Sequence, residues 1–443
     1  MNNDYVFSPR ARIACFSGDE QSFEALTTSF ERAGFDVAKP DAGKPADLGL
    51  IDLRKRPVPA RKAKTIASVL RRKSPESPLV FLVDPALDAP AKAALKRFGE
   101  IIPAHNDVDH ALVRCKEILR LRNIAEETGE RLKSLATLNR LVEFPLIATS
   151  EARARVLIAG APDPAAIAAV NAVGAIAEDC ICVLTAGQAM RALEYGEFDC
   201  AIFLPTPEND PMLAFIRTLR RHPRHAHMAV IQIADHSVDL SNYARKGARD
   251  FILSEQISTE LGPKAQVVSR RARLLRSMST FLRSCRGDNI RDASSGAFTS
   301  AFLSEHGARL CGRADQTGRP LSLGLVRLNP ERGAGTGAQR NALVQAARMI
   351  NRITRAEDLV ARISADKFVV LTAATQVDDA INAARRIEGV LSNTAFRNGK
   401  DAPPFSVGVT TEFVARAPGA SIEETVALAM RRLDHASSAK AQK

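Results

Sequence analysis

Short apolar runs alternate with amphipathic stretches over the first two thirds of the chain. One series has apolar runs at Arg12–Phe16, Leu48–Ile51 and Pro78–Val83, with helical patterns at Gln21–Ala33 and Asp109–Ile124. A second series has apolar runs at Arg155–Ile158, Cys200–Leu204 and Met228–Ile233, a helical pattern at Pro164–Val173 and a turn at Gly247–Asp250. Such runs between helices predict parallel strands with helices on both faces of each sheet. We predict two doubly wound α/β domains over residues 10–125 and 153–275, with a helical extension over 126–152.

A basic segment follows the second predicted domain. From Lys264 to Arg291 it holds eight basic residues, and Asp288 is its only acid. We predict a basic linker helix over residues 276–290. Charge runs usually mark a solvated face, and the alternative is that these arginines extend an anion site on the next domain. Apolar and helical patterns then resume and predict a third α/β domain over residues 291–438.

The composition is that of a folded cytoplasmic protein. With 443 residues the chain allows about three domains. Its 45% hydrophobic and 25% charged residues exclude long disorder. The cysteines are isolated except for Cys180-Ile-Cys182, which favours reduced thiols over disulfides or a zinc site. The N-terminus lacks an apolar signal region, and the stretch Ala165–Ala177 is too short to cross a bilayer. We therefore expect no membrane insertion.

The net charge of +12 fits a polyanionic partner without specifying its kind. The chain has no Trp and three Tyr, so aromatic platforms for single-stranded nucleic acid are scarce. No helix-turn-helix or Arg-rich tail is evident. We therefore expect no nucleic-acid partner, and a nucleic-acid binder is an alternative that rests on the net charge alone.

The order of elements in both predicted domains resembles the receiver domain of two-component response regulators. That resemblance implies an acceptor Asp at a strand end, an acidic pair for Mg²⁺ and a Lys that offsets phosphoryl charge. Asp52 holds the acceptor position, but Ser17-Gly18 stand where the acidic pair belongs, and Asp19-Glu20 lie two residues further on. No Lys occurs between Lys96 and Lys116. We expect Asp52 to be a poor phosphoacceptor.

The second receiver-like domain has lost the same chemistry completely. Gly160-Ala161 occupy the positions of the acidic pair, Leu204 that of the acceptor, and Ser254 that of the lysine. An α/β module without this chemistry is expected to serve as an interaction surface or dimerisation element. We expect a homodimer formed through the receiver-like domains.

The third predicted domain resembles the GGDEF domain of diguanylate cyclases. The matching segments are Arg291–Gly296, Leu321–Val326, Arg352–Leu371 and Phe405–Val409. Within them Asp292 and Gly296, followed by Phe302, match the entry motif of that family. The resemblance implies an α/β fold of the nucleotidyl cyclase type.

The catalytic residues of that family are replaced. Joining two GTP molecules needs Mg²⁺ held by carboxylates, yet Arg327 stands at the position of the metal-binding Asp. The signature appears as Ser364-Ala365-Asp366-Lys367-Phe368, without the glycines that let a phosphate approach the backbone. Thr299 replaces the Asn that would contact guanine. We predict no catalytic residue and no metal site, and Asp366 is then a residue of the hairpin turn.

A second family motif is intact. In cyclases an RxxD motif five residues before the signature binds the product, cyclic di-GMP, and Arg355-Ala-Glu-Asp358 has that sequence and spacing. A carboxylate accepts from N1–H and N2 of guanine, while Arg donates to its O6/N7 edge or to phosphate. By spacing, Arg386 matches an additional ligand-binding Arg of the family. The alternatives are an exposed ion pair at Arg355–Asp358 and a solvated helix position at Arg386.

The order receiver, receiver, GGDEF resembles PleD-type response regulators, and a lost active site beside an intact RxxD resembles non-enzymatic effectors among them. That likeness implies a cytoplasmic signalling adaptor of cell-cycle control, located at a cell pole, that delivers regulators to the ClpXP protease. We predict a cyclic di-GMP receptor that needs no cofactor. The alternatives are an atypical or heterodimer-dependent diguanylate cyclase and a switch driven by phosphorylation of Asp52.

Overall fold

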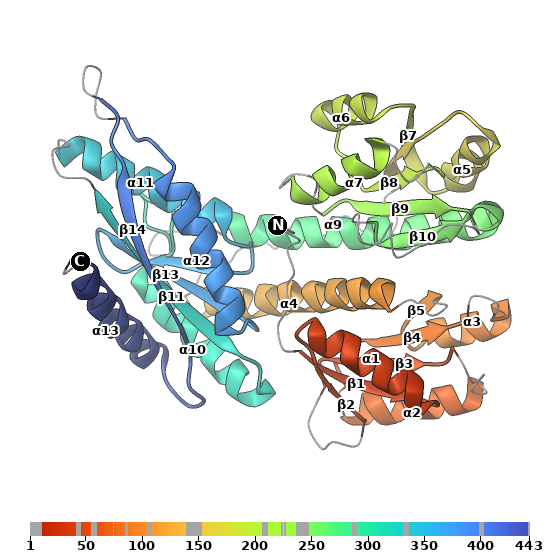
Figure 1. The fold of residues 1–443 in the computed structure, drawn as a ribbon, viewed down its shortest axis with the longest axis horizontal. Helices are drawn as coiled ribbons and strands as arrows, with labels where there is room; N and C mark the ends of the chain where they lie inside the picture. The colour runs from red at the N-terminus through yellow and green to blue at the C-terminus, as the bar shows by residue number, and fades with distance from the viewer. Residues whose placement is uncertain are drawn as a thin grey trace.

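The computed structural model describes residues 11–40, 46–54, 60–73, 75–84, 87–103, 108–138, 153–205, 211–222, 225, 227–235, 248–285, 290–330, 336–397 and 403–441. These residues form two parallel five-stranded sheets and one four-stranded sheet, each flanked by helices (Figure 1). The predicted α/β class with parallel sheets and a cyclase-like C-terminal domain is confirmed. The predicted turn residue Gly247 and most of the extension, residues 139–152, lie outside the described residues.

The first domain is a parallel sheet of order β2-β1-β3-β4-β5. Its elements are β1 (Arg12–Ser17), α1 (Glu20–Arg32), β2 (Asp36–Ala38), β3 (Leu48–Asp52), α2 (Ala60–Lys73), β4 (Leu79–Val83), α3 (Ala89–Lys96), β5 (Glu100–Pro103) and α4 (Asp109–Thr137). Every residue of β3 and β4 is buried, as expected for central strands covered on both faces. These strands carry the continuous apolar runs of the sequence.

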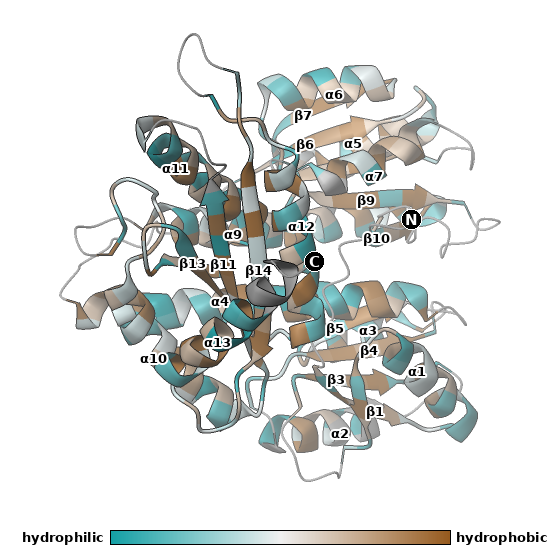
Figure 2. Ribbon diagram, turned by 60° about the vertical axis from the view of Figure 1, so that its left-hand side comes forward, coloured by the Kyte–Doolittle hydropathy of each residue, from teal (hydrophilic) through white to brown (hydrophobic). Residues whose placement is uncertain are grey.

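The second domain repeats this arrangement with the sheet order β10-β9-β8-β6-β7. Its elements are β6 (Ala154–Ala159), α5 (Pro164–Gly174), β7 (Ala177–Val183), α6 (Ala186–Tyr195), β8 (Cys200–Phe203), α7 (Pro211–Arg221), β9 (Ala229–Ala234), β10 (Asp250–Leu253), η1 (Ser254–Gln256), η2 (Ile257–Leu261) and α9 (Gly262–Ser284). Helices α6 and α7 cover one face, and α5 and α9 cover the other. The inner strands are apolar, and α6 is largely polar, whereas α5 is largely apolar (Figure 2).

The third domain has an antiparallel sheet of order β12-β13-β11-β14. Its elements are α10 (Ser300–Thr317), β11 (Leu321–Pro330), α11 (Thr336–Ile353), β12 (Leu359–Arg362), β13 (Lys367–Ala373), α12 (Val377–Ser392), β14 (Val407–Ala415) and α13 (Ile422–Ala441). One core lies between the sheet and α10 and α13, and a second lies between the sheet and α11 and α12.

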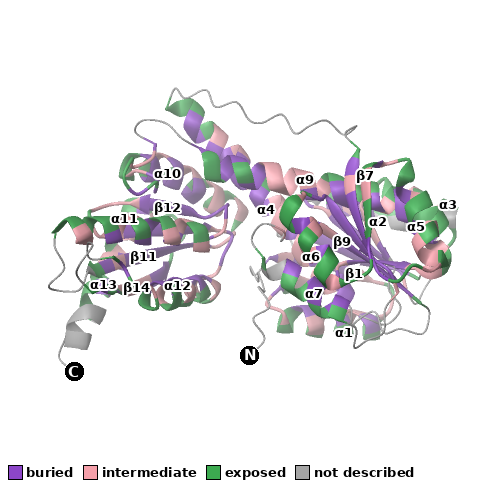
Figure 3. Cartoon of the chain, turned by 90° about the horizontal axis from the view of Figure 1, so that it is seen from above, coloured by how far each residue is buried: buried purple, intermediate pink, exposed green. Residues whose placement is uncertain are grey.

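Two long helices join the receiver-like domains to the third domain. Helix α4 has 29 residues and continues past Ile124 into the predicted helical extension, as far as Thr137, and α9 has 23 residues. They lie side by side and reach the third domain together (Figures 1 and 3). The basic segment is therefore largely the last helix of the second domain. Among the described residues no helix is long and apolar enough to span a membrane.

Candidate functional site

Asp52, the predicted phosphoacceptor, is already paired. It is buried at the end of β3, and its two carboxylate oxygens accept from Nε and Nη2 of Arg54, each at 2.9 Å. Asp19 caps α1 by accepting from the Ser22 amide at 2.9 Å, and Glu20 pairs with Lys39 at 3.1 Å. A guanidinium therefore lies against the carboxylate where a metal ion and a phosphoryl group would have to bind.

The corresponding position of the second domain is apolar. Leu204 is buried, and a Cβ atom added to Gly160 would lie only 2.6 Å from the Cβ of Leu204. Gly160 has a φ of +150°, so a carboxylate-bearing residue there would be both strained and crowded. The structure leaves no room for an acidic pair at this sheet edge.

The degenerate signature forms a hairpin that closes on itself. We call residues 363–366, between β12 and β13, the signature hairpin. The Ser364 hydroxyl donates to Asp366 Oδ1 at 2.8 Å and accepts from the Lys367 amide at 3.1 Å. Arg362 donates to the carbonyls of Ser364 and Ala365, each at 2.9 Å. Asp366 thus lies in the turn, and its carboxylate serves the hairpin itself.

Two cations occupy the sheet positions beside the hairpin. Arg327 of β11 lies directly opposite Lys367 of β13 in the antiparallel register. Arg327 Nη1 contacts Asp434 of α13 at 3.1 Å. Phe368, the next residue of the strand, is buried. Within the described ranges no group of three or more His, Cys, Asp or Glu side chains is placed to hold a metal ion. This arrangement opposes Mg²⁺ binding by charge.

Thr299 and Asp292 of the entry segment have structural roles. The Thr299 hydroxyl caps α10 by accepting from the Phe302 amide at 3.2 Å. Asp292 accepts from Ser295 and from Arg362, the latter at 3.0 Å. Partial burial acts to raise the pKa of Asp292, but the hydrogen bonds from Ser294, Ser295 and Arg362 outweigh it and hold that pKa well below its usual range.

The Arg355–Asp358 motif forms a tight loop between α11 and β12. We call residues 354–358 the RxxD loop. Asp358 Oδ2 accepts from the Arg355 amide at 2.9 Å, and the Asp358 amide donates back to the Arg355 carbonyl at 3.3 Å. Asp358 is buried, whereas the side chains of Arg355 and of Arg386, on α12, remain half-buried. The carboxylate of Asp358 is therefore less accessible to solvent than the side chains of Arg355 and Arg386.

The charges of Arg355 and Arg386 both act on the Asp358 carboxylate. Burial raises the pKa of Asp358 to about 6; the charges of Arg355 and Arg386 oppose this rise, and Glu357 adds to it. Asp379 of α12 belongs to the same surroundings, since Arg355 also acts on its carboxylate. A carboxylate between two arginines can recognise a guanine edge and an adjacent phosphate at once. Asp379 and Glu357 were missed in the sequence because no motif marks them.

Both long helices hold the backbone of the RxxD loop. From α9, Arg283 donates to the carbonyls of Asn351 at 2.9 Å and Thr354 at 3.1 Å. From α4, the fully buried Arg131 donates to the Leu282 carbonyl at 3.1 Å and lies 3.5 Å from that of Glu357. One arginine of the basic segment thus supports the loop, whereas Arg276 and its neighbours on α9 pair within the receiver-like domains.

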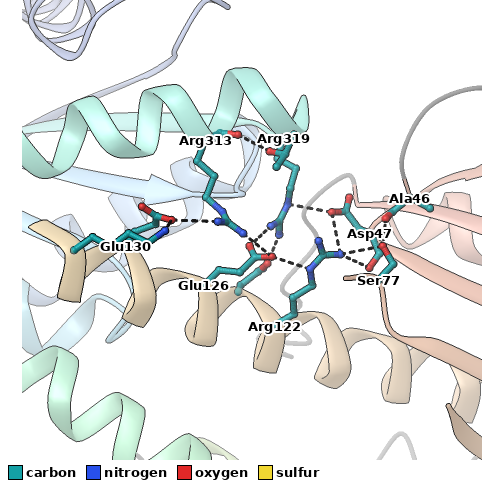
Figure 4. A network of polar contacts seen from close by, with 11 residues as sticks. Ala46, Asp47, Ser77, Arg122, Glu126, Glu130, Arg313 and Arg319 are labelled. Atoms are coloured by element: carbon teal, nitrogen blue, oxygen red, sulfur yellow. Dashed lines mark hydrogen bonds and ion pairs between the residues drawn. The ribbon is translucent and has the colours of Figure 1, made fainter. Parts of the chain in front are cut away.

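A second network joins the first domain to the third through α4. Figure 4 shows Arg122 of α4 between the Asp47 carbonyl, at 2.6 Å, and Glu126, at 2.8 Å. Arg313, on α10, contacts Glu126 at 3.0 Å, and Arg319 contacts Asp47 at 3.2 Å. Burial raises the pKa of Glu126, but the surrounding arginines outweigh burial and lower it overall. These alternating charges fix α4 against the domain that carries the RxxD loop.

The comparisons with known proteins concern the third domain. Residues 326–443 match the family model described as diguanylate cyclase, GGDEF domain, which identifies a GGDEF domain in this chain. The chain is similar to the solved GGDEF domain of DgcB from Caulobacter crescentus in complex with c-di-GMP, at 17% identity and a TM-score of 0.33, over 35% of this chain and 92% of that chain. It is also similar to diguanylate cyclase SiaD from Pseudomonas aeruginosa in complex with its activator SiaC, at 22% identity and a TM-score of 0.33, over 41% and 69%. No curated protein matches the chain significantly.

Proposed function

We propose that this chain is a receptor for cyclic di-GMP that does not catalyse its synthesis. The observation that carries the proposal is the grouping of Arg355, Asp358 and Arg386 around one loop whose backbone is held by Arg131 and Arg283. Cyclic di-GMP carries two guanine edges and two phosphates, which match a carboxylate and two guanidinium groups. Ligand binding would favour one position of the RxxD loop and hence one arrangement of α4 and α9.

The absence of catalysis is part of the proposal. Arg327 and Lys367 lie opposite each other on neighbouring strands, where the family resemblance places a carboxylate that holds Mg²⁺. In the signature hairpin, the Ser364 hydroxyl donates a hydrogen bond to the Asp366 carboxylate. We expect no cyclic di-GMP when the protein is incubated with GTP and Mg²⁺. Product formation in that assay would contradict this part and would favour an atypical cyclase.

Calorimetry with cyclic di-GMP tests the ligand. The wild-type chain should bind, and Arg355→Ala should lower the affinity at least tenfold, as expected for loss of a charged hydrogen bond of about 1.5–3 kcal/mol. Arg352→Ala is a matched control, because Arg352 is an exposed arginine three residues earlier on α11. Equal binding by wild type and Arg355→Ala would make the proposal wrong.

The cellular role follows from resemblance alone. Two receiver-like domains, a degenerate GGDEF signature and an intact RxxD motif resemble PopA, an effector of alphaproteobacterial cell-cycle control. On that likeness we propose a cytoplasmic adaptor that moves to a cell pole and delivers regulators to the ClpXP protease. We further propose that it acts as a homodimer and that Asp52 is no phosphoacceptor, since Arg54 engages both of its oxygens. Acetyl phosphate labelling that Asp52→Asn abolishes would contradict the last point.

A further inference from the structure

The two receiver-like domains contact each other on the sides of their sheets where β5 and β10 lie. Arg114 of α4 contacts Asp250 of β10 at 3.4 Å, and Arg271 of α9 contacts Glu100 of β5 at 2.9 Å. His110 lies edge-on to Phe251, and burial lowers the pKa of His110 to about 4, so this interface stays uncharged at that position. Strands β2 and β7 are consequently the outer edges of the two sheets.

These two outer edges differ sharply. Strand β2 has three residues, and its first residue, Asp36, is engaged by Arg12 at 2.8 Å. Strand β7 has seven residues and, within the described part of the chain, hydrogen-bonds to β6 alone. Short, charged edges prevent pairing with other chains, whereas long edges favour it. The first domain therefore has a protected edge. We call β7 the open edge of the second domain, because Cys180–Val183 are uncharged and lie beyond the register shift and the acids at the start of the strand.

Apolar side chains gather around the open edge. The described residues include eight exposed large hydrophobic side chains, and five of them belong to α5, β7, α6 or the residue after β7. These are Ile167, Val170, Ile181, Leu184 and Tyr195. The described parts of α1 and β2, which correspond to α5 and β7, carry none. Because α5 and α6 cover opposite faces of the sheet, an added strand would meet apolar groups on both of its faces.

We propose that β7 pairs antiparallel with β7 of a second copy of this chain, which joins the two sheets into one. The charge pattern of the strand favours a second copy. Glu178 and Asp179 lie near its start, and Cys180–Val183 are uncharged. Antiparallel pairing sets the acidic half of each strand against the uncharged half of the other. Parallel pairing would bring the acids together, and like charges on neighbouring strands are destabilising.

Side-chain alternation restricts the register of this pair. A two-fold axis perpendicular to the sheet requires opposing side chains to lie on the same face, so one residue lies on the axis. Asp179 on the axis would oppose the same acid of the second copy, and Cys182 would leave most of the strand unpaired, so Cys180 or Ile181 lies at the centre. In the first register Cys180 faces Cys180 of the second copy. In the second register it faces Cys182. Opposing Cα atoms then lie about 4.5–5.5 Å apart, which a disulfide can span.

The first experiment measures mass. The β7 pair is the interface of the homodimer in the proposed function, and its formation does not require cyclic di-GMP. Light scattering on the ligand-free chain should give twice 47.9 kDa, and Ile181→Lys should return it to the mass of one chain. Val390→Lys on α12 is the control, because Val390 is 42% exposed and Ile181 36%, and it should remain dimeric. A monomeric wild type, or a dimeric Ile181→Lys variant, would overturn the proposal.

The second experiment uses the native thiols. Cys182 is exposed and Cys180 half-buried, while the other five cysteines are buried. Copper-phenanthroline with oxygen should remove two protons and two electrons from a pair of thiols and form one interchain disulfide. The Cys180→Ser variant should form no interchain disulfide in either register. The Cys182→Ser variant should still form one if Cys180 lies at the centre, where it faces Cys180 of the second copy. A cross-link that persists in Cys180→Ser would refute the pairing. The Ile181→Lys variant should bind cyclic di-GMP as tightly as the wild type does. A wrong dimer interface can therefore be distinguished from a wrong assignment of the ligand.

Discussion

The signature hairpin and the RxxD loop lie at opposite ends of β12, and the fold uses them differently. The Ser364 hydroxyl bonds to Asp366 within the hairpin. The further bonds of this turn, from the Leu328 amide to the Asp366 carbonyl and from Arg362 to Asp292, stay within the third domain. The RxxD loop is bonded from outside its domain, by Arg131 and Arg283. Residues of a turn that bonds only within its own domain can change without disturbing the contacts between domains. A loop that anchors two long helices is constrained by every group that contacts it. On the proposed function, this difference would allow the signature hairpin to change its residues while the RxxD loop keeps Arg355 and Asp358.

The largest expected effect comes from removing the α4 anchor. Arg131→Ala should lower the free energy of unfolding by about 3–5 kcal/mol, because it leaves the buried Glu127 without its guanidinium partner. Urea denaturation measures this change. Lys133→Ala, whose side chain is 61% exposed, should change stability by less than about 0.5 kcal/mol. Similar effects from both variants would mean that the RxxD loop is not specially anchored.

The next effect separates the two carboxylates. Asp358→Asn should weaken cyclic di-GMP binding by at least about 1.5 kcal/mol, or tenfold, because an amide no longer accepts both guanine donors as a charged group. Asp366→Asn should leave the affinity unchanged, since Asp366 serves the hairpin turn. Calorimetry on the two variants compares them directly. Equal losses would show that the hairpin takes part in recognition.

The third effect is a pH dependence of the same site. Burial raises the pKa of Asp358 to about 6, above its ordinary 3.8. The ligand-free fold therefore gains stability from this group at low pH and loses it as pH rises through about 6. Ligand binding has the opposite preference, because guanine needs the ionised carboxylate. Affinity should fall about tenfold between pH 7 and pH 5, and a flat profile across that range would contradict the assignment. In Asp358→Asn this pH dependence should disappear.

The smallest effect concerns the hairpin itself. Lys367→Glu restores one carboxylate but leaves Arg327 opposite it. We expect no cyclase activity with GTP and Mg²⁺, and a stability change within about 0.5 kcal/mol, as for other substitutions away from the core. Formation of cyclic di-GMP by this variant would show that Lys367 alone prevents catalysis in the wild-type protein.

Helices and strands were predictable where the pattern of apolar and polar residues within the segment itself determines the structure. The apolar run Leu48–Ile51 is the core of β3, and the pattern at Pro164–Val173 is α5. A helical extension after Ile124 was predicted, but the burial of this part of α4 was not. Its polar residues Glu127 and Arg131 resemble a solvated face, but His306 and the Leu282 carbonyl bury them from another domain. Periodicity cannot show a partner that lies 150 residues away in the chain.

The sequence by itself determined the chemical inventory of this protein. Arg327, Lys367, Arg355 and Asp358, and the spacing between them, are set by the sequence alone. Only the tertiary structure decided how each group is used. It pairs Asp52 with Arg54, buries Asp358 where the charges of Arg355 and Arg386 act on it, and protects one outer sheet edge while leaving the other open. The reason is physical: identity sets which interactions are possible, but burial and neighbouring charge set their strength, and both depend on segments far apart in the chain.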